Sequence, residues 1–201
     1  ETARHQGKWD DNKYHISTNV WNPGIEIGED YVRIDGLQIE RVYTLGVDST
    51  VYVGSKKEFY FSNNIIKRSN TIATGISFQS TSDGVYYAWN NIVYGSHDYG
   101  IYENWLSSDA TLYVFNNTVS DCSVWGIRRA EATMVANNNI VQDSTIDYYG
   151  TFHASSSNNI SSDSTAPGTN SKTNTEVSFV DATHNDYHLA LNDTAARNAG
   201  T

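Results

Sequence analysis

The sequence is poor in several kinds of residue, and each shortage excludes something. Cys122 is the single cysteine, so the chain has no internal disulfide and no thiolate metal cluster. Its neighbours Val119, Ser123 and Val124 give no sign of an activated thiol, and we expect an inert, partly buried residue. The low mean hydropathy and the absence of a long apolar run exclude a transmembrane helix.

Basic residues are also scarce relative to acidic ones. The chain has 13 Lys and Arg against 23 Asp and Glu, which gives a formal net charge of −10. Nucleic acid is therefore not expected as a main partner, because a duplex requires a basic face to displace its counterions. The acidity also weakens the case for a highly anionic polysaccharide, although a local basic patch can override net charge. The plentiful Tyr, Trp, Ser, Thr, Asn and Gly favour strands and turns over helices.

A pair of asparagines closes a short apolar run five times. Successive pairs are separated by 27, 26, 22 and 20 residues, counted between their second members Asn64, Asn91, Asn117, Asn139 and Asn159. A repeat of about 20–50 residues indicates a solenoid, a propeller or an array. Asparagine suits a repeated corner because it tolerates the left-handed backbone conformation. Stacked about 4.8 Å apart, buried amides can also hydrogen-bond one another as a ladder.

A second landmark follows each asparagine pair. A turn-rich stretch leads to a glycine that is usually followed by isoleucine, as in Gly75-Ile76, Gly100-Ile101, Gly126-Ile127 and, less clearly, Gly150-Thr151. Each unit therefore predicts short strands joined by corners, with no helical period. A propeller blade would need about twice this length and four strands, so each unit is predicted to be one coil of a β-solenoid.

Two regions are expected along the chain. Residues 1–23 carry no clear repeat and predict an irregular lead-in or cap. Residues 24–201 form the solenoid domain, with a polar excursion near 161–178. Because the sequence starts at Glu1 without an initiator methionine, we expect an excised piece of a longer protein.

These features resemble a known superfamily. The Asn-Asn-Ile coil ends, the glycines that open the next strand and a closing Asp186-Tyr187-His188-Leu189 resemble the right-handed parallel β-helix proteins, similar in fold to pectate lyases. The resemblance covers roughly residues 24–201. It implies an all-β right-handed parallel β-helix, or β-solenoid, with short strands, Asn-rich corners and about 20–27 residues per coil. The superfamily includes polysaccharide lyases, glycoside hydrolases, epimerases, adhesins and phage tailspikes, so the resemblance implies an extracellular or cell-surface protein and leaves the activity open.

Alignment of the coils on their glycines predicts a candidate site on one lateral face. The aromatic residues that would contact a sugar chain are Tyr99, Tyr102, Trp125 and Tyr149. The candidate catalytic residues beside them are Glu103, Arg128, Arg129 and His153. A carboxylate could act as general acid or base, the histidine could move protons, and an arginine could neutralise a uronate carboxylate or serve as the base of a β-elimination.

The same residues also have a purely structural interpretation. Stacked aromatic residues stabilise a solenoid without any ligand, and Glu103 with Arg129 could form an ordinary cross-strand or buried pair. Trp9, Trp21 and Trp89 lack partners in this alignment and are typical of core or cap positions. The sequence contains no Gly-Gly-x-Gly-x-Asp calcium repeat, HExxH or phosphate-binding glycine loop, so it predicts no metal site and identifies no cofactor.

Two functional hypotheses follow from these observations. The first is an extracellular module that contacts polysaccharide along its lateral face, with activity as a polysaccharide lyase or glycoside hydrolase left open. The alternative is a non-catalytic stalk, fibre or adhesin segment. Because the open ends of a solenoid expose unpaired strand edges, such a segment could self-associate end to end.

Overall fold

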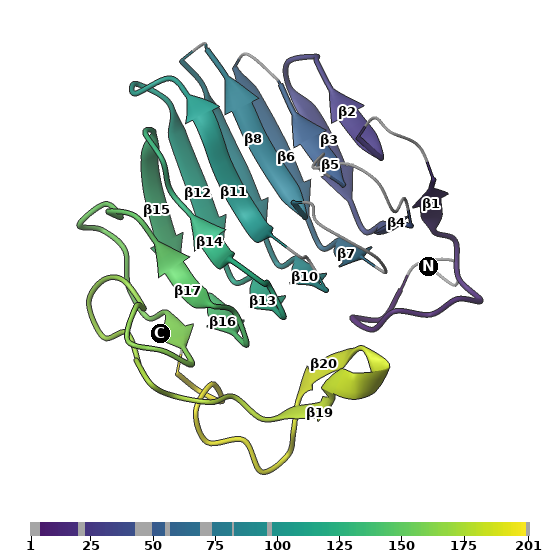
Figure 1. The fold of residues 1–201 in the computed structure, drawn as a ribbon, viewed down its shortest axis with the longest axis vertical. Helices are drawn as coiled ribbons and strands as arrows, with labels where there is room; N and C mark the ends of the chain where they lie inside the picture. The colour runs from purple at the N-terminus through teal and green to yellow at the C-terminus, as the bar shows by residue number, and fades with distance from the viewer. Residues whose placement is uncertain are drawn as a thin grey trace.

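The computed structural model describes residues 5–19, 23–42, 50–54, 57–68, 74–81, 83–95 and 98–199. It is a parallel β-solenoid built from three stacked parallel sheets (Figure 1), which confirms the predicted all-β class and the short strands. The chain passes through the three sheets in turn, so three consecutive strands make one coil.

The order of the strands shows how the coils stack. Sheet A contains, in spatial order, β1 (Ile16–Thr18), β4 (Gln38–Arg41), β7 (Ile65–Arg68), β10 (Ile92–Tyr94), β13 (Thr118–Ser120), β16 (Ile140–Gln142) and β18 (Ile160–Ser161). Sheet B contains β17 (Ile146–Tyr149), β14 (Trp125–Arg128), β11 (Tyr99–Leu106), β8 (Ile76–Ser80), β5 (Val51–Val53) and β2 (Ile25–Ile27). Sheet C contains β15 (Thr133–Asn137), β12 (Thr111–Phe115), β9 (Val85–Trp89), β6 (Glu58–Ser62) and β3 (Val32–Asp35).

The asparagine pairs form the corner between sheets C and A, and their two members have different roles. The first member always has a left-handed backbone, with φ between 54° and 57° at Asn63, Asn90, Asn116, Asn138 and Asn158. In an earlier coil, Gly36 occupies this position with φ 76°. The predicted left-handed corner is therefore confirmed, and asparagine accepts it because its side chain tolerates this region better than other non-glycine side chains.

The second members form the predicted ladder of buried amides. The side-chain Nδ2 of Asn117 donates to the carbonyl oxygen of Ala88 at 2.9 Å and to Oδ1 of Asn139 at 3.0 Å. Its own Oδ1 accepts hydrogen bonds from the backbone N–H and from Nδ2 of Asn91, both at 3.0 Å. Side-chain bonds of this kind run from Asn64 to Asn159. The ladder lets buried polar groups satisfy one another inside the solenoid.

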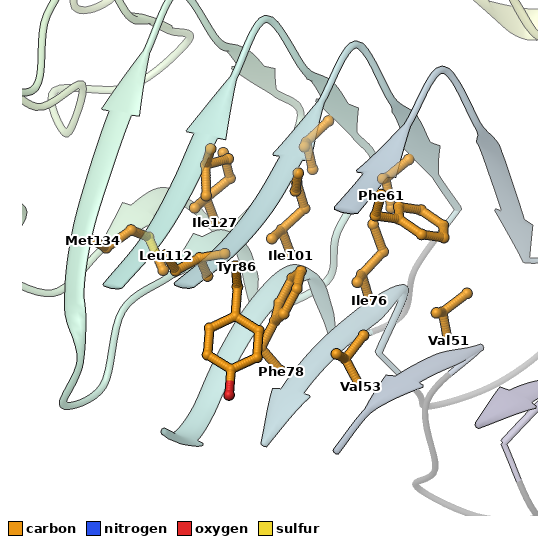
Figure 2. Packing of buried hydrophobic residues seen from close by; sticks show 14 of the residues in the cluster. Val51, Val53, Phe61, Ile76, Phe78, Tyr86, Ile101, Leu112, Ile127 and Met134 are labelled. Carbon is orange, nitrogen blue, oxygen red and sulfur yellow. The ribbon is translucent and has the colours of Figure 1, made fainter. Parts of the chain in front are cut away.

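The core lies between the three sheets. Alternate strand residues point inward, and Figure 2 shows such side chains from neighbouring coils packed in files, among them Phe78, Ile101 and Leu112. The Phe78 ring lies edge-on to the ring of Phe59, with the centroids 6.3 Å apart. Each fully buried side chain of this size contributes about 1.5–3 kcal/mol of apolar burial. The buried cluster extends from Ile27 in β2 to Tyr148 in β17, so the core runs along the stack.

Both ends of the described chain lie against the outer face of sheet A. Trp9 from the N-terminal segment and Tyr187 from β20 (Asp186–Leu189) are buried there with Ile65 and Tyr94. β20 pairs with β19 (Phe179–Asp181) across the 3₁₀ turn Ala182–His184, and Figure 1 shows this hairpin beside the strands of sheet A. An ion pair of 3.3 Å between Lys8 and Asp186 joins the two segments. β1, which falls in the expected lead-in of residues 1–23, pairs with β4.

The polar excursion near 161–178 stacks on the last coil. Thr169 and Lys172 form parallel bridges to Ser157 and Ile160. The strand edge of β17 is also covered, because the backbone N–H of Tyr148 donates to Oγ1 of Thr165 at 2.9 Å. At this end of the solenoid the strand edges therefore have partners within the chain, which leaves less edge for the predicted end-to-end association.

Candidate functional site

Five side chains gather on the outer face of sheet B: Tyr99, Tyr102, Trp125, Arg128 and Tyr149, which we call the sheet B cluster. Tyr99 pairs with Trp125 and Tyr102 with Arg128, as the glycine alignment predicts. The Trp125 ring stacks on Tyr99, with centroids 4.9 Å apart, and on Tyr149, with centroids 4.3 Å apart. The sequence thus brings together four aromatic residues and one cation from three neighbouring strands.

Arg128 is the charged member of this cluster. Its Cζ atom lies 4.5 Å from the ring centroid of Tyr102 and 4.7 Å from that of Trp125, so the guanidinium makes cation–π contacts with both rings. Within the part of the chain that the structure describes, Arg128 forms no ion pair and its buried Nε has no hydrogen-bond acceptor. Burial raises the pKa of Tyr102, although the positive charge of Arg128 opposes the rise. The phenol is therefore neutral at physiological pH, and the cluster carries a local positive charge.

The predicted glycine alignment is wrong at Gly150. Trp125 pairs with Ile146 and Arg128 with Tyr149, so Asp147 takes the place of the next glycine. The physical reason is a shorter turn after Asn139, which brings the strand into register three residues earlier than the glycine pattern suggests. The Tyr149 ring nevertheless leans onto Trp125 and joins the cluster, with 42% of the residue exposed.

The same shift removes His153 from the predicted file. Its backbone N–H donates to the carbonyl oxygen of Met134 at 2.9 Å, which places it at the edge of β15 in sheet C. The residue is exposed, and its ring Nδ1 accepts a hydrogen bond from the backbone of Ser155 at 3.2 Å. His153 therefore does not lie in one file with Glu103 and Arg129, as the alignment predicted.

The Glu103 side chain is buried beneath sheet B, where its carboxylate accepts hydrogen bonds from backbone N–H groups. One carboxylate oxygen accepts the N–H of Leu106 at 3.0 Å, and the other accepts those of Ala130 and Glu131 at 2.6 and 2.7 Å. Arg129 is engaged separately, because its Nε and one Nη donate to carbonyl oxygens of the turn that follows it. The four predicted catalytic residues thus occupy different environments, and only Arg128 stands beside the predicted sugar-binding residues.

Sequence reasoning missed a second aromatic face on sheet C. The rings of Tyr60, Tyr87 and Tyr113 stack in register, with centroid separations of 5.0 and 5.1 Å. Trp89 lies edge-on to two of them, and Arg33 lies 5.6 Å from its ring, so the interpretation of Trp89 as an aromatic without partners is wrong. The signal was present, because each of the three tyrosines stands four residues before the second asparagine of a pair.

Trp9 and Trp105, the other tryptophans that the structure describes outside the two aromatic faces, differ in burial. Trp9 is buried against sheet A, as a core or cap position predicts, and Trp21 lies outside the described residues. Trp105 was not selected from the sequence, yet it is 64% exposed and has a left-handed backbone with φ 63°. It follows Tyr102 on β11, so it lies on one of the two strands that each contribute two residues to the sheet B cluster.

Three further observations concern metal binding, membrane spans and similarity to known proteins. Among the described residues, no group of three or more His, Cys, Asp or Glu side chains is arranged to hold a metal ion. No helix within those residues is long and apolar enough to span a membrane. Comparison of the chain with protein-family models, with curated proteins and with solved structures finds no match.

Proposed function

We propose that this chain is an extracellular module that binds an acidic polysaccharide through the sheet B cluster. The single observation that carries the proposal is the environment of Arg128. It is a cation held by ring contacts, without an acidic partner among the described residues, on the surface of an acidic chain. The resemblance to parallel β-helix proteins, many of which act on or bind polysaccharides, agrees with this function and with an extracellular or cell-surface location.

A uronate sugar matches the chemistry of the cluster. Its carboxylate can accept charge-assisted hydrogen bonds from the guanidinium, which are roughly twice as strong as neutral ones. Its C–H faces can pack against the exposed part of Tyr149, and phenol groups can hydrogen-bond its hydroxyls. The overall charge of −10 opposes an anionic polymer at long range, but ions screen such repulsion beyond about 8–10 Å. Contact with Arg128 is therefore expected to decide the binding.

The proposal is limited to binding. The carboxylate of Glu103 is fully buried and accepts three backbone hydrogen bonds, so a surface ligand does not reach it. His153 lies at the edge of sheet C rather than beside the cluster. Lyase or hydrolase activity would therefore need residues other than this set.

The test measures binding of polygalacturonate and alginate by calorimetry, with starch and a soluble cellulose derivative as neutral polymers. Sheet C supplies matched control variants, because Arg33 and Trp89 form a similar cation–π pair on the other aromatic face. We expect Arg128→Ala and Trp125→Ala each to weaken binding of the acidic polymer about tenfold or more. Arg33→Ala and Trp89→Ala should leave it unchanged. Equal losses on both faces, or tighter binding of the neutral polymers, would refute the assignment.

One observation favours a structural function as the second candidate. On both aromatic faces the rings stack nearly parallel, with angles between ring planes of 7–16°, so they cover one another's faces. Such pairs contribute about 0.5–1.5 kcal/mol each beyond apolar burial. Binding of no polymer, together with equal loss of stability in Trp125→Ala and Tyr87→Ala, which each remove the central ring of a stack, would favour a stalk or fibre segment.

A further inference from the structure

Trp105 has an unusual backbone for its residue type. Among the described non-glycine residues with positive φ, all except Tyr31 and Trp105 are asparagine or aspartate. Large side chains rarely adopt this region, because Cβ approaches the backbone closely. Residues held in such a conformation are found preferentially at functional sites. The strain at Trp105 is not offset by burial, since 64% of the residue is exposed.

A bulge in β11 produces this conformation. Glu103 pairs with Phe78 and Leu106 pairs with Ser80, so two residues of β11, Asn104 and Trp105, stand opposite the single residue Gln79. A bulge of this kind bends the strand and redirects one side chain. Here it turns Trp105 outward, and within the described chain no other aromatic ring contacts it.

Glu103 fixes the bulge from below. It accepts the N–H of Leu106, the first residue after the bulge, and it also ties this coil to the turn at Ala130 and Glu131 in the next coil. A fully buried carboxylate is stable only when hydrogen bonds compensate for its lost hydration, and these three bonds do so. Glu103 therefore acts on Trp105 through the backbone, as a positioning residue.

We infer that Trp105 is a second contact for the same polysaccharide, and that the sugar chain lies along β11, across the axis of the solenoid. This inference rests on the proposed function of the sheet B cluster. Tyr99, Tyr102 and Trp105 are spaced along β11, and the three residues from Tyr102, which pairs with Arg128, to Trp105 span at most about 10 Å of strand. The cluster grips one part of the chain near Arg128, and Trp105 offers an open ring face to a part further along. A short oligosaccharide reaches the cluster alone, whereas a longer one reaches both contacts.

Oligogalacturonates of defined length test this arrangement. We expect Trp105→Ala to weaken binding of the hexamer about tenfold and to leave binding of the dimer unchanged. Tyr31→Ala is the matched control, because Tyr31 is also 64% exposed and has φ 60° but lies beside β3, away from the cluster. The control should bind both oligomers as the unmodified chain does. If Trp105→Ala weakens dimer and hexamer equally, or neither, the inference is wrong.

Glu103→Gln tests the positioning role. Glutamine keeps the size of the side chain but replaces one acceptor oxygen with an N–H₂ group, which cannot accept the N–H donors it faces. We expect the variant to lose hexamer affinity and retain dimer affinity, and to add no further loss in the Trp105→Ala background. Loss of dimer affinity, or a further loss in the double variant, would overturn that role. If the unmodified chain binds neither oligomer, the proposed function fails first, which separates the two outcomes.

Discussion

Removal of one rung from the asparagine ladder should destabilise the solenoid far more than replacement of its neighbour. Asn117 is the central rung, and its side chain takes part in four hydrogen bonds. Asn116 precedes it, is exposed, and holds the corner with φ 54°. The two residues therefore separate the two roles of each pair: one supplies buried hydrogen bonds and the other supplies a backbone conformation.

The magnitude follows from the groups that Asn117→Ala leaves without partners. The backbone N–H of Asn91 loses its acceptor in a buried site, which costs about 1–3 kcal/mol. The three other bonds, to Asn91, Ala88 and Asn139, contribute about 0.5–1.5 kcal/mol each. We expect a total loss of about 3–5 kcal/mol after partial relaxation, against a typical stability of about 5–15 kcal/mol for a domain.

Asn116→Gly is the matched control. Glycine adopts positive φ without a steric penalty, and the side chain that it removes is exposed. We therefore expect the free energy of unfolding to change by no more than about 0.5 kcal/mol. An alanine at the same position would add the cost of a left-handed backbone, about 1–2 kcal/mol.

The assay is equilibrium unfolding in urea, followed by far-ultraviolet circular dichroism and by tryptophan fluorescence. Coincident transitions and an unchanged slope would show that both variants unfold as the unmodified chain does. A loss below about 1 kcal/mol in Asn117→Ala would show that the buried amides contribute little. Equal losses in the two variants would show that their roles are not separate.

Three other predictions concern stability and reactivity. Burial raises the pKa of the Cys122 thiol, so the native chain should not react with a thiol reagent that labels it fully after unfolding; rapid native labelling would contradict this. Gly126→Ala should lower the free energy of unfolding by about 1–3 kcal/mol, because a Cβ there meets the carbonyl oxygen of Asp147 at 2.7 Å. Gly28→Ala, where a Cβ has no neighbour within 4 Å, should be nearly neutral in the same urea titration. Burial opposes ionisation of Asp193, but hydrogen bonds from backbone N–H groups, including those of Ser178 and Ala196, outweigh it and hold its pKa below the usual value. The stability it contributes is therefore present above the unfolded pKa of about 4 and is lost as pH falls through the lower folded value, so melting temperature should fall less steeply with acid in Asp193→Asn than in the unmodified chain.

The inward-facing features of this fold could be predicted because every coil repeats them. Each coil must turn the same corner and satisfy the same buried polar groups, so asparagine recurs at Asn64, Asn91 and Asn117 in an apolar frame. The same logic predicts the inward isoleucines at Ile76, Ile101 and Ile127, which pair with one another in sheet B. These positions record the packing of one coil on the next, and that packing hardly varies along the stack.

The turns could not be predicted in the same way, and the candidate site depends on them. Turn length is free to vary because turns face solvent, and the shorter turn before β17 moved Asp147 into the place of a glycine. The predicted alignment is wrong there. Tyr149 belongs to the cluster only because its ring stacks on Trp125, and the alignment assigned His153 to sheet B although it lies beside sheet C. The bulge at Trp105 is equally local, since it adds one residue to one coil.

The placement of Glu103 shows why a charged residue on a repeated strand is ambiguous in sequence. It stands opposite Phe78, a core position, and strict alternation after Ile101 turns it inward. A buried carboxylate at such a position must accept hydrogen bonds from several donors, because it has lost its hydration. Here the donors come from the bulge after it and from the next coil. The irregularity that exposes Trp105 therefore supplies one of the hydrogen bonds that allow Glu103 to be buried.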